Sequence, residues 1–370
     1  MVSILKKATL LLLAVFALVS CQEKGSPDIE YIPFKREYND NWGLIGIDGK
    51  ILFENKYSSC PSPSYNGVFM LKGEDGYEFY TTEEEPKKVA GPFKRACPFT
   101  DVVTPVLTKD GDLQIIDRKG KVVKVVNEIE GKKVRYIYNF EHGKAPFELK
   151  GGGCGFLDTD GDVFLSPGFG FKARVLDNGN LEVIKNGDQG YMTVVFDSNG
   201  EVVDSLQSTS KAGLFDGKYF VTDGYSSNGV LDVHGNEIIP SERSRTVVDM
   251  LYDHFVLKGW MEMSLVNNQG ETLLKSDYWN IKIVDKDRLL LGLKGQGAVL
   301  ADYTGKELTE PIFRIEKMSR YYDGKVMPVQ RDDFRWIFID KEGRPINNES
   351  YKVLDFYNEG YNARNFCVYP

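Results

Sequence analysis

The stretch FLDTDGDVFL (156–165) places Asp158, Asp160 and Asp162 around a glycine, Gly161. Alternating carboxylates beside a glycine are compatible with a calcium loop, with the acid pair of a hydrolase, or with a tight turn between two strands. The stretch alone does not distinguish these three alternatives. Its copies elsewhere in the chain do, and they also decide the fold.

Seven other segments repeat the pattern of this stretch. In each, an apolar pair leads into Asp, Asn or Gly, two variable positions follow, and a glycine precedes another apolar-rich run. The eight glycines are Gly49, Gly120, Gly161, Gly200, Gly235, Gly270, Gly305 and Gly343. Asp or Asn at the first position of a turn accepts backbone hydrogen bonds, and glycine at the fourth adopts a positive φ without steric cost. We therefore predict a hairpin at each copy, with a type I turn and a glycine bulge.

The copies recur at a nearly fixed period. Successive glycines are 35 to 41 residues apart, except that the first gap, of 71 residues, is about two periods long. A degenerate copy is therefore expected near residue 84, where FYTTEEEP (79–86) lacks the glycine. Nine units of about 37 residues indicate a repeat architecture, in which each unit buries its apolar face against its neighbours.

A short strand is expected before each hairpin. Four of these strands carry a proline at one register, namely Pro33, Pro105, Pro146 and Pro328. Because proline cannot donate to a sheet ladder, we expect this strand to be innermost or outermost in its unit, with one free side. The segment FCVY (366–369) resembles the first of these strands and begins a tenth unit, which either caps an open array or adds to a ring.

The repeat resembles that of the bacterial WG-repeat family, whose unit runs roughly Trp-Gly-Phe-Ile-Asp-x-x-Gly-Lys and continues into an apolar strand and Phe-x-x-Gly-x-Ala. The matching segments are WGLI (42–45), CGFLD (154–158), WIFID (336–340) and FEHGKA (140–145). The resemblance covers about residues 31–370, although tryptophan occupies its place in only two of the eight copies. It implies an exported or membrane-associated protein and no general enzymatic activity.

The fold class expected for residues 31–370 is all-β, made of about nine tandem units of 35–40 residues built from short antiparallel strands. Two arrangements fit such units. A β-propeller closes them into a ring, whereas an open β-hairpin solenoid leaves them in a row. We predict the propeller, although nine units exceed the four to eight blades that are typical.

The N-terminus carries an export signal. Lys6 and Lys7 precede an apolar run (8–19) of twelve residues, too short to cross a bilayer, which requires roughly 20 residues. The run ends in LVSC (18–21), which resembles the lipobox of bacterial lipoproteins, whose cysteine becomes the lipidated first residue. We predict a lipoprotein signal peptide over 1–20, and a lipidated Cys21 followed by a polar tether over 21–30.

The charge balance excludes one class of partner. The chain holds 46 Lys and Arg against 54 Asp and Glu, a formal net charge of −8, and no basic stripe offsets it. An acidic surface repels phosphate backbones, so we expect no nucleic-acid partner. The partners expected are a membrane, through the N-terminal lipid, and a protein or glycan of the cell envelope.

The repeated turns offer no shared chemistry. Gly46 and Asn267 replace aspartate at the first turn position, so that position selects for turn geometry and not for charge. In the opening stretch, Asp158, Asp160 and Asp162 are followed by apolar residues rather than by the further acid of a calcium loop, which leaves calcium as a weak alternative. No zinc motif or nucleophile–histidine pair is present, so we expect no metal, cofactor or catalytic residues.

Two further pairs are candidates for specific roles. Cys60 and Cys97 lie one period apart, so adjacent units could join them by a disulfide; buried thiols are the alternative. Trp260 and Trp279 lie outside the repeat register and could stack on a sugar or anchor a partner, the alternative being core packing.

These observations predict a non-enzymatic, lipid-anchored protein of the cell envelope whose repeat surface binds a protein or glycan. The outer membrane is the expected location, on its periplasmic or its surface face. A glycan-active hydrolase or lyase on a propeller is the alternative function, and it would require a carboxylate pair at one mouth of the ring.

Overall fold

The computed structural model describes the ranges 29–166, 170–176, 178–188, 190–208, 218–222, 229–242, 245–260, 262–276, 278–318, 325–354 and 367–369. Every named element in these ranges is a strand, and the strands pair antiparallel. The predicted signal peptide and Cys21 lie outside the described residues. Within them, no helix is long and apolar enough to cross a membrane.

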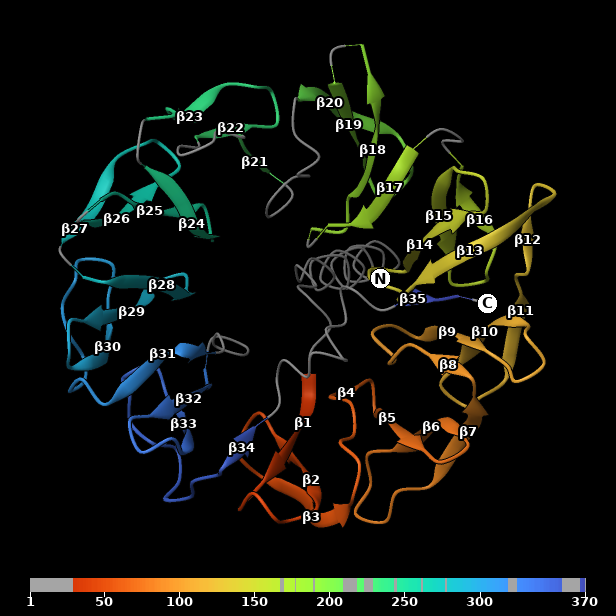
Figure 1. Cartoon of the computed structure of the whole chain (residues 1–370), viewed down its shortest axis with the longest axis horizontal. Coiled ribbons are helices and arrows are strands. Elements are labelled where there is room, and N and C mark those ends of the chain that lie inside the picture. The colour runs from red at the N-terminus through yellow and green to blue at the C-terminus, as the bar shows by residue number, and fades with distance from the viewer. Residues whose placement is uncertain are drawn as a thin grey trace, which may run out of the picture.

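Grouped by repeat unit, the described strands form nine blades arranged in a ring (Figure 1). Blade 1 holds β34 (Val353–Leu354), β1 (Ile29–Lys35), β2 (Trp42–Gly46) and β3 (Ile51–Tyr57). Blade 2 holds β4 (Ser64–Tyr65), β5 (Val68–Gly73), β6 (Gly76–Thr81) and β7 (Lys88–Phe93). Blade 3 holds β8 (Arg95–Ala96), β9 (Val103–Leu107), β10 (Leu113–Asp117) and β11 (Val122–Val125).

Blades 4 to 6 follow the same order around the ring. Blade 4 holds β12 (Glu128–Ile129), β13 (Lys132–Tyr138), β14 (Lys144–Leu149), β15 (Cys154–Asp158), β16 (Val163–Leu165) and the C-terminal β35 (Cys367–Val368). Blade 5 holds β17 (Gly170–Val175), β18 (Leu181–Gly187), β19 (Gly190–Phe196) and β20 (Val202–Ser208). Blade 6 holds β21 (Tyr219–Val221), β22 (Val230–Asp232) and β23 (Glu237–Ile239).

Blades 7 to 9 complete the ring. Blade 7 holds β24 (Thr246–Leu251), β25 (His254–Lys258), β26 (Met263–Asn267) and β27 (Thr272–Ser276). Blade 8 holds β28 (Asn280–Asp285), β29 (Arg288–Leu293) and β30 (Gly297–Ala301). Blade 9 holds β31 (Phe313–Met318), β32 (Met327–Arg331) and β33 (Trp336–Ile339). Strand β1 starts two residues before the expected domain start at residue 31.

The repeated stretch forms the predicted turn. Gly161 has a φ of 78°, its N–H donates to the Asp158 carbonyl at 3.0 Å, and the Asp158 N–H donates to the Asp162 carbonyl at 2.9 Å. The Asp158 carboxylate accepts from the backbone N–H groups of Asp160 and Asp162. The ladder shifts register beside the turn, as a glycine bulge requires. All eight repeat glycines have a positive φ, and the degenerate copy forms the β6–β7 hairpin, so these predictions are confirmed.

The turn glycine also touches the preceding blade. A Cβ added to Gly161 would lie 2.9 Å from Lys124 Cβ and 3.0 Å from Ile115 Cδ1, both of blade 3. A Cβ on Gly49 of blade 1 would lie 2.9 Å from Asn347 Nδ2, which follows the last strand of blade 9. The glycine is therefore required twice, once by its φ and once by the closeness of its neighbour.

The core is divided into seams between blades. Nine buried apolar clusters exist among the described residues, and each joins two adjacent blades. One of them packs Phe338 of blade 9 against Ile32 and Phe34 of blade 1. Nine units in a row would have only eight seams, so the ninth closes the ring, and the propeller prediction is confirmed over the open solenoid.

Closure is made by a short strand from the far end of the chain. In β34, Leu354 pairs with Phe34 and Val353 with Lys35 of β1, so the last repeat supplies the innermost strand of the first blade. The C-terminal β35 then adds to β13 on the inner side of blade 4, where Val368 pairs with Ile137 and is fully buried. The final strand therefore adds to a ring and does not cap an open array.

The expectation for the proline strand was wrong in one respect. Its strands β1, β9, β14 and β32 are second from the inside and not innermost or outermost. The pairing of each with its inner neighbour reaches the residue after the proline, at Phe34, Val106, Phe147 and Val329, and is broken or absent at the proline itself. Proline is tolerated there because the inner ladder does not require its missing N–H.

Candidate binding site

The hairpin order gives the ring two chemically different faces. The turns between the first and second and between the third and fourth strands of each blade share one face, which we call the turn face. The loops between the second and third strands of each blade lie on the opposite face of the ring, which we call the loop face. Five of the seven aromatic side chains that are exposed among the described residues belong to the loop face: Tyr38, Phe171, Trp260, Trp279 and Phe334.

Trp260 is the most exposed of these side chains. It lies in the tight loop between β25 and β26 of blade 7, where Lys258 pairs with Met263 and the Gly259 N–H donates to the Glu262 carbonyl at 2.9 Å. Its side chain is 93% exposed. Burying a tryptophan is strongly favourable, so an indole held in water at a loop tip is typical of a contact residue. The core-packing alternative does not apply to Trp260.

Trp279 lies on the next blade and is 41% exposed. It precedes β28, and its N–H donates to the Gly292 carbonyl of β29 at 3.1 Å. A Cβ added to Gly292 would lie 2.7, 2.8 and 3.2 Å from Nε1, Cε2 and Cδ1 of the indole. These similar distances to three atoms of the five-membered ring place Gly292 under one face of the ring, which fixes the indole flat against the strand.

A groove of about 460 Å³ runs between blades 7 and 8 beside this indole. It is lined by Val248, Asp249, Lys258, Met263, Trp279, Asn280, Ile281 and Lys282. The Asp249 carboxylate accepts from the backbone N–H groups of Met250, at 3.0 Å, and Ile283, at 3.1 Å. Lys258 and Met263 are the ends of the loop that carries Trp260, so the two tryptophans flank one groove.

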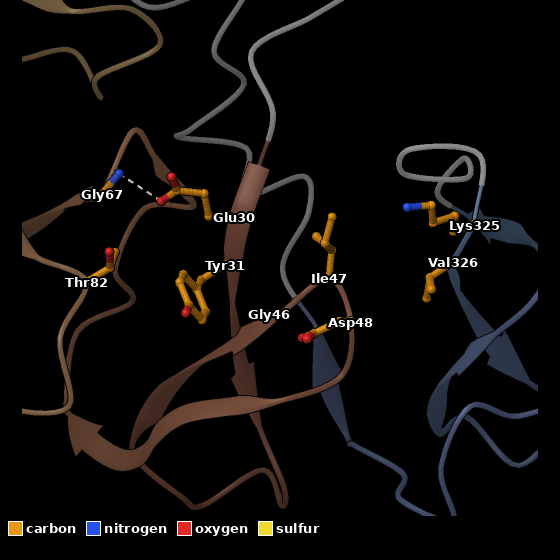
Figure 2. A pocket seen from close by; sticks show the side chains of 9 residues that line it. All are labelled: Glu30, Tyr31, Gly46, Ile47, Asp48, Gly67, Thr82, Lys325 and Val326. Atoms are coloured by element: carbon orange, nitrogen blue, oxygen red, sulfur yellow. Dashed lines mark hydrogen bonds between the residues drawn. The ribbon is translucent and has the colours of Figure 1, made fainter.

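A second pocket, of about 520 Å³, lies on the turn face between blades 9, 1 and 2. Figure 2 shows Glu30 and Thr82 on one side, Lys325 on the other, and the hairpin tip that carries Asp48 between them. Glu30 accepts from the Gly67 N–H at 2.8 Å. Burial acts to raise the pKa of Asp48, but the amide and ammonium groups of Lys50 outweigh it and hold that pKa below its usual value.

The three aspartates of the opening stretch do not form a calcium site. Asp158 binds backbone amides of its own turn, and Asp162 forms an ion pair with Lys124 of blade 3. In the part of the chain that the structure describes, no group of three or more His, Cys, Asp or Glu side chains is placed to hold a metal ion. The Asp158 and Asp162 carboxylates serve the turn and the seam instead, and the described residues give the weak calcium alternative no support.

Of the two possibilities for Cys60 and Cys97, the structure shows the thiol alternative and not the disulfide. Cys97 is fully buried in the seam between blades 3 and 4, whereas Cys60 is half-buried before β4 and contacts the Pro61 carbonyl. Packed sheets lie about 10 Å apart, and a disulfide needs Cα atoms within about 7 Å. Equivalent positions of adjacent blades are therefore too widely separated to bridge.

Sequence reasoning singled out the two tryptophans but missed their neighbours Tyr38, Phe171 and Phe334. These lie at the loop face on blades 1, 5 and 9, outside the period that identified the repeats. The signal that could have found Tyr38 and Phe334 is an aromatic residue in the loop that precedes the Trp-Gly-like strand. Phe171, at the start of β17, carries no such signal.

Comparisons with known proteins agree with this fold. No protein-family model matches the chain, and no curated protein matches it. A crystal structure of the eukaryotic initiation factor is 12% identical, with a TM-score of 0.55 over 89% of this chain and 97% of that one. BamB from Moraxella catarrhalis is 14% identical, with a TM-score of 0.34 over 77% of this chain and 92% of that one. The C-terminal WD40 domain of Sif2 is 10% identical, with a TM-score of 0.34 over 86% of this chain and 84% of that one.

Proposed function

We propose that the chain is a lipid-anchored protein of the cell envelope, similar to the WG-repeat family, that works by binding. A lipidated Cys21 would hold it at the outer membrane, and the loop face of the propeller would bind a protein or glycan partner without catalysis. The lipobox-like LVSC (18–21) supports the anchor. The gathering of exposed aromatic side chains on one face, led by Trp260, carries the binding proposal.

The contrast between the two faces supports this assignment. On the turn face, the repeated aspartates bind their own backbone, and the glycines beside them contact the preceding blade. On the loop face, exposed rings lie on at least five of the nine blades, and Trp260, the most exposed of them, belongs to none of the buried clusters that form the seams. Exposed aromatic rings that are not needed for folding are the usual anchors of an interface.

A pull-down from envelope extract with the soluble form, residues 22–370, tests the proposal. Trp260→Ala should lose the captured partner, whereas Tyr252→Ala, an exposed aromatic on the turn face of the same blade, should retain it. Matching thermal unfolding curves of both variants would show that the ring is intact. Equal capture by the parent and by Trp260→Ala would contradict the assignment of the loop face.

A glycan-active hydrolase or lyase is the second candidate, because Glu30 and Asp48 place two carboxylates in the turn-face pocket (Figure 2). The lowered pKa of Asp48 argues against it as a proton donor, which needs a raised pKa. Release of reducing ends from envelope glycans by the parent, and its loss in Glu30→Gln, would favour this candidate over a purely binding role.

A further inference from the structure

We propose that the groove between blades 7 and 8 is a saccharide subsite that accepts an acidic sugar, with Trp279 as the stacking platform. This inference rests on the proposed binding role of the loop face and names the class of ligand that one part of it takes. Three observations carry it: the support beneath the indole, the polar groups around the groove, and its size.

The first observation is the support beneath the indole. Gly292 lies under one face of the Trp279 ring, and the partial exposure of the side chain leaves the ring accessible from the groove that it lines. The face of an aromatic ring carries negative charge density, and the C–H groups of a sugar ring present the complementary positive surface. A ring fixed before binding loses little conformational freedom when the ligand arrives, so this platform is preorganised.

The second observation is the set of polar groups. The lining contains the side-chain amide of Asn280, the ammonium groups of Lys258 and Lys282, and the carboxylate of Asp249. That carboxylate is already held by two backbone N–H groups. Because the Asp249 carboxylate is engaged, the Lys258 ammonium sets the charge that a ligand meets at this end of the groove, on a chain of net charge −8. A sugar that carries a carboxylate complements this charge, whereas a neutral sugar does not.

The third observation is size. A cavity of about 460 Å³ falls within the range of small-molecule sites, roughly 300–1,000 Å³. Trp260, at the tip of the loop whose ends line the groove, is placed to contact the next sugar of a chain. The groove therefore suits a short segment of an acidic polysaccharide.

The experiment titrates the soluble form, residues 22–370, with galacturonic acid tetrasaccharide and, as the neutral arm, with the matching β-1,4-linked galactose tetrasaccharide. Binding is measured by calorimetry and by tryptophan fluorescence. Of the four tryptophans of the chain, Trp279 lines the groove and is partly exposed, whereas Trp336 is buried. Trp279→Ala removes the platform. Gly292→Ala keeps the indole but displaces it, since the new Cβ would meet the ring at 2.7 Å. Tyr252→Ala, an exposed aromatic on the turn face of blade 7, is the matched control.

We expect the acidic tetrasaccharide to bind at least about tenfold more tightly than the neutral one and to weaken as salt rises. Both Trp279→Ala and Gly292→Ala should weaken binding about tenfold or more, and Tyr252→Ala should leave it unchanged. Circular dichroism should show every variant folded at the temperature of the titration. The proposal is overturned if neither sugar binds below about 10 mM, if the neutral sugar binds as tightly, or if both groove variants bind like the parent. If the saccharide proposal fails in one of these ways but the pull-down still captures a partner that depends on Trp260, the proposed binding function stands. If the pull-down shows no dependence on Trp260, the proposed binding function fails, whatever the titration gives.

Discussion

Replacing Gly161 by alanine tests the double requirement for glycine in the repeated turn. The residue has a φ of 78°, in a region that L-residues other than glycine enter at a cost of about 1–2 kcal/mol. The new Cβ would also lie within 3.0 Å of Lys124 Cβ and Ile115 Cδ1 across the seam, and overpacking of this kind costs about 1–3 kcal/mol. We therefore expect a loss of about 2–5 kcal/mol in the free energy of unfolding.

Gly143→Ala is the matched control for this substitution. Gly143 has a φ of 76°, but a Cβ there would meet nothing within 4 Å. It should lose only the conformational part, about 1–2 kcal/mol. The difference between the two variants then isolates the contact between blade 4 and blade 3.

Urea unfolding followed by circular dichroism and by tryptophan fluorescence measures both variants against the parent. Hydrogen exchange should place the extra destabilisation of Gly161→Ala at β10 and β11, the strands that its new methyl group would push. Equal losses in the two variants would refute the reasoning, because the glycine would then serve the turn alone and not the seam.

Three further predictions follow from single contacts. Removing residues 367–370 should cost about 1.5–3 kcal/mol at the seam between blades 3 and 4, because Val368 is fully buried there, and hydrogen exchange in β13 measures it. The free energy of unfolding should fall as acid protonates the turn carboxylates. The pKa of Asp302 is lowered mainly by a hydrogen bond from the Thr304 hydroxyl. The contribution of Asp302 to stability is therefore present above its unfolded pKa of about 3.9 and is lost as the pH falls through its folded pKa. Asp302→Asn, which copies the asparagine of blade 7, should flatten that loss in acid unfolding curves; an unchanged slope would contradict the assignment. Burial raises the pKa of the Cys154 thiol to about 12, so iodoacetamide at pH 8 should label it only after unfolding; labelling of the native chain at the rate of a small thiol would be the opposite result.

The local structure could be predicted from sequence because its chemistry repeats. One copy of FLDTDGDVFL is ambiguous, but asparagine and glycine in place of its first aspartate identify a turn, and the period then gives the number of units. The closure of nine blades into one ring was harder to predict, and the sequence only favoured it over an open solenoid. It depends on the angle between neighbours across each seam and on β34, a strand of two residues that follows the last repeat without a pattern of its own.

The site was only partly predictable for a related reason. Trp260 and Trp279 were recognisable because they break the period, but the period says nothing of what lies beside them. Gly292 follows Trp279 by 13 residues and looks like any strand glycine in the sequence. Its role becomes visible only when β29 is placed beneath the indole. The possible Cys60–Cys97 disulfide is absent for the opposite reason, because one period along the chain gives equivalent positions and not contact.

The two faces of the ring differ in how freely their residues can change, and this bears on where function resides. A Cβ at most of the repeat glycines of the turn face would meet the preceding blade at 3.4 Å or less. Gly111, Gly151, Gly152 and Gly295, in the loops of the other face, would meet nothing within 4 Å. Substitutions at the repeat glycines therefore alter the seams that hold the ring together, whereas these four loop glycines can vary without meeting a neighbour. The loop face therefore offers positions at which a binding surface can change at low structural cost, and that is the face on which the exposed tryptophans lie.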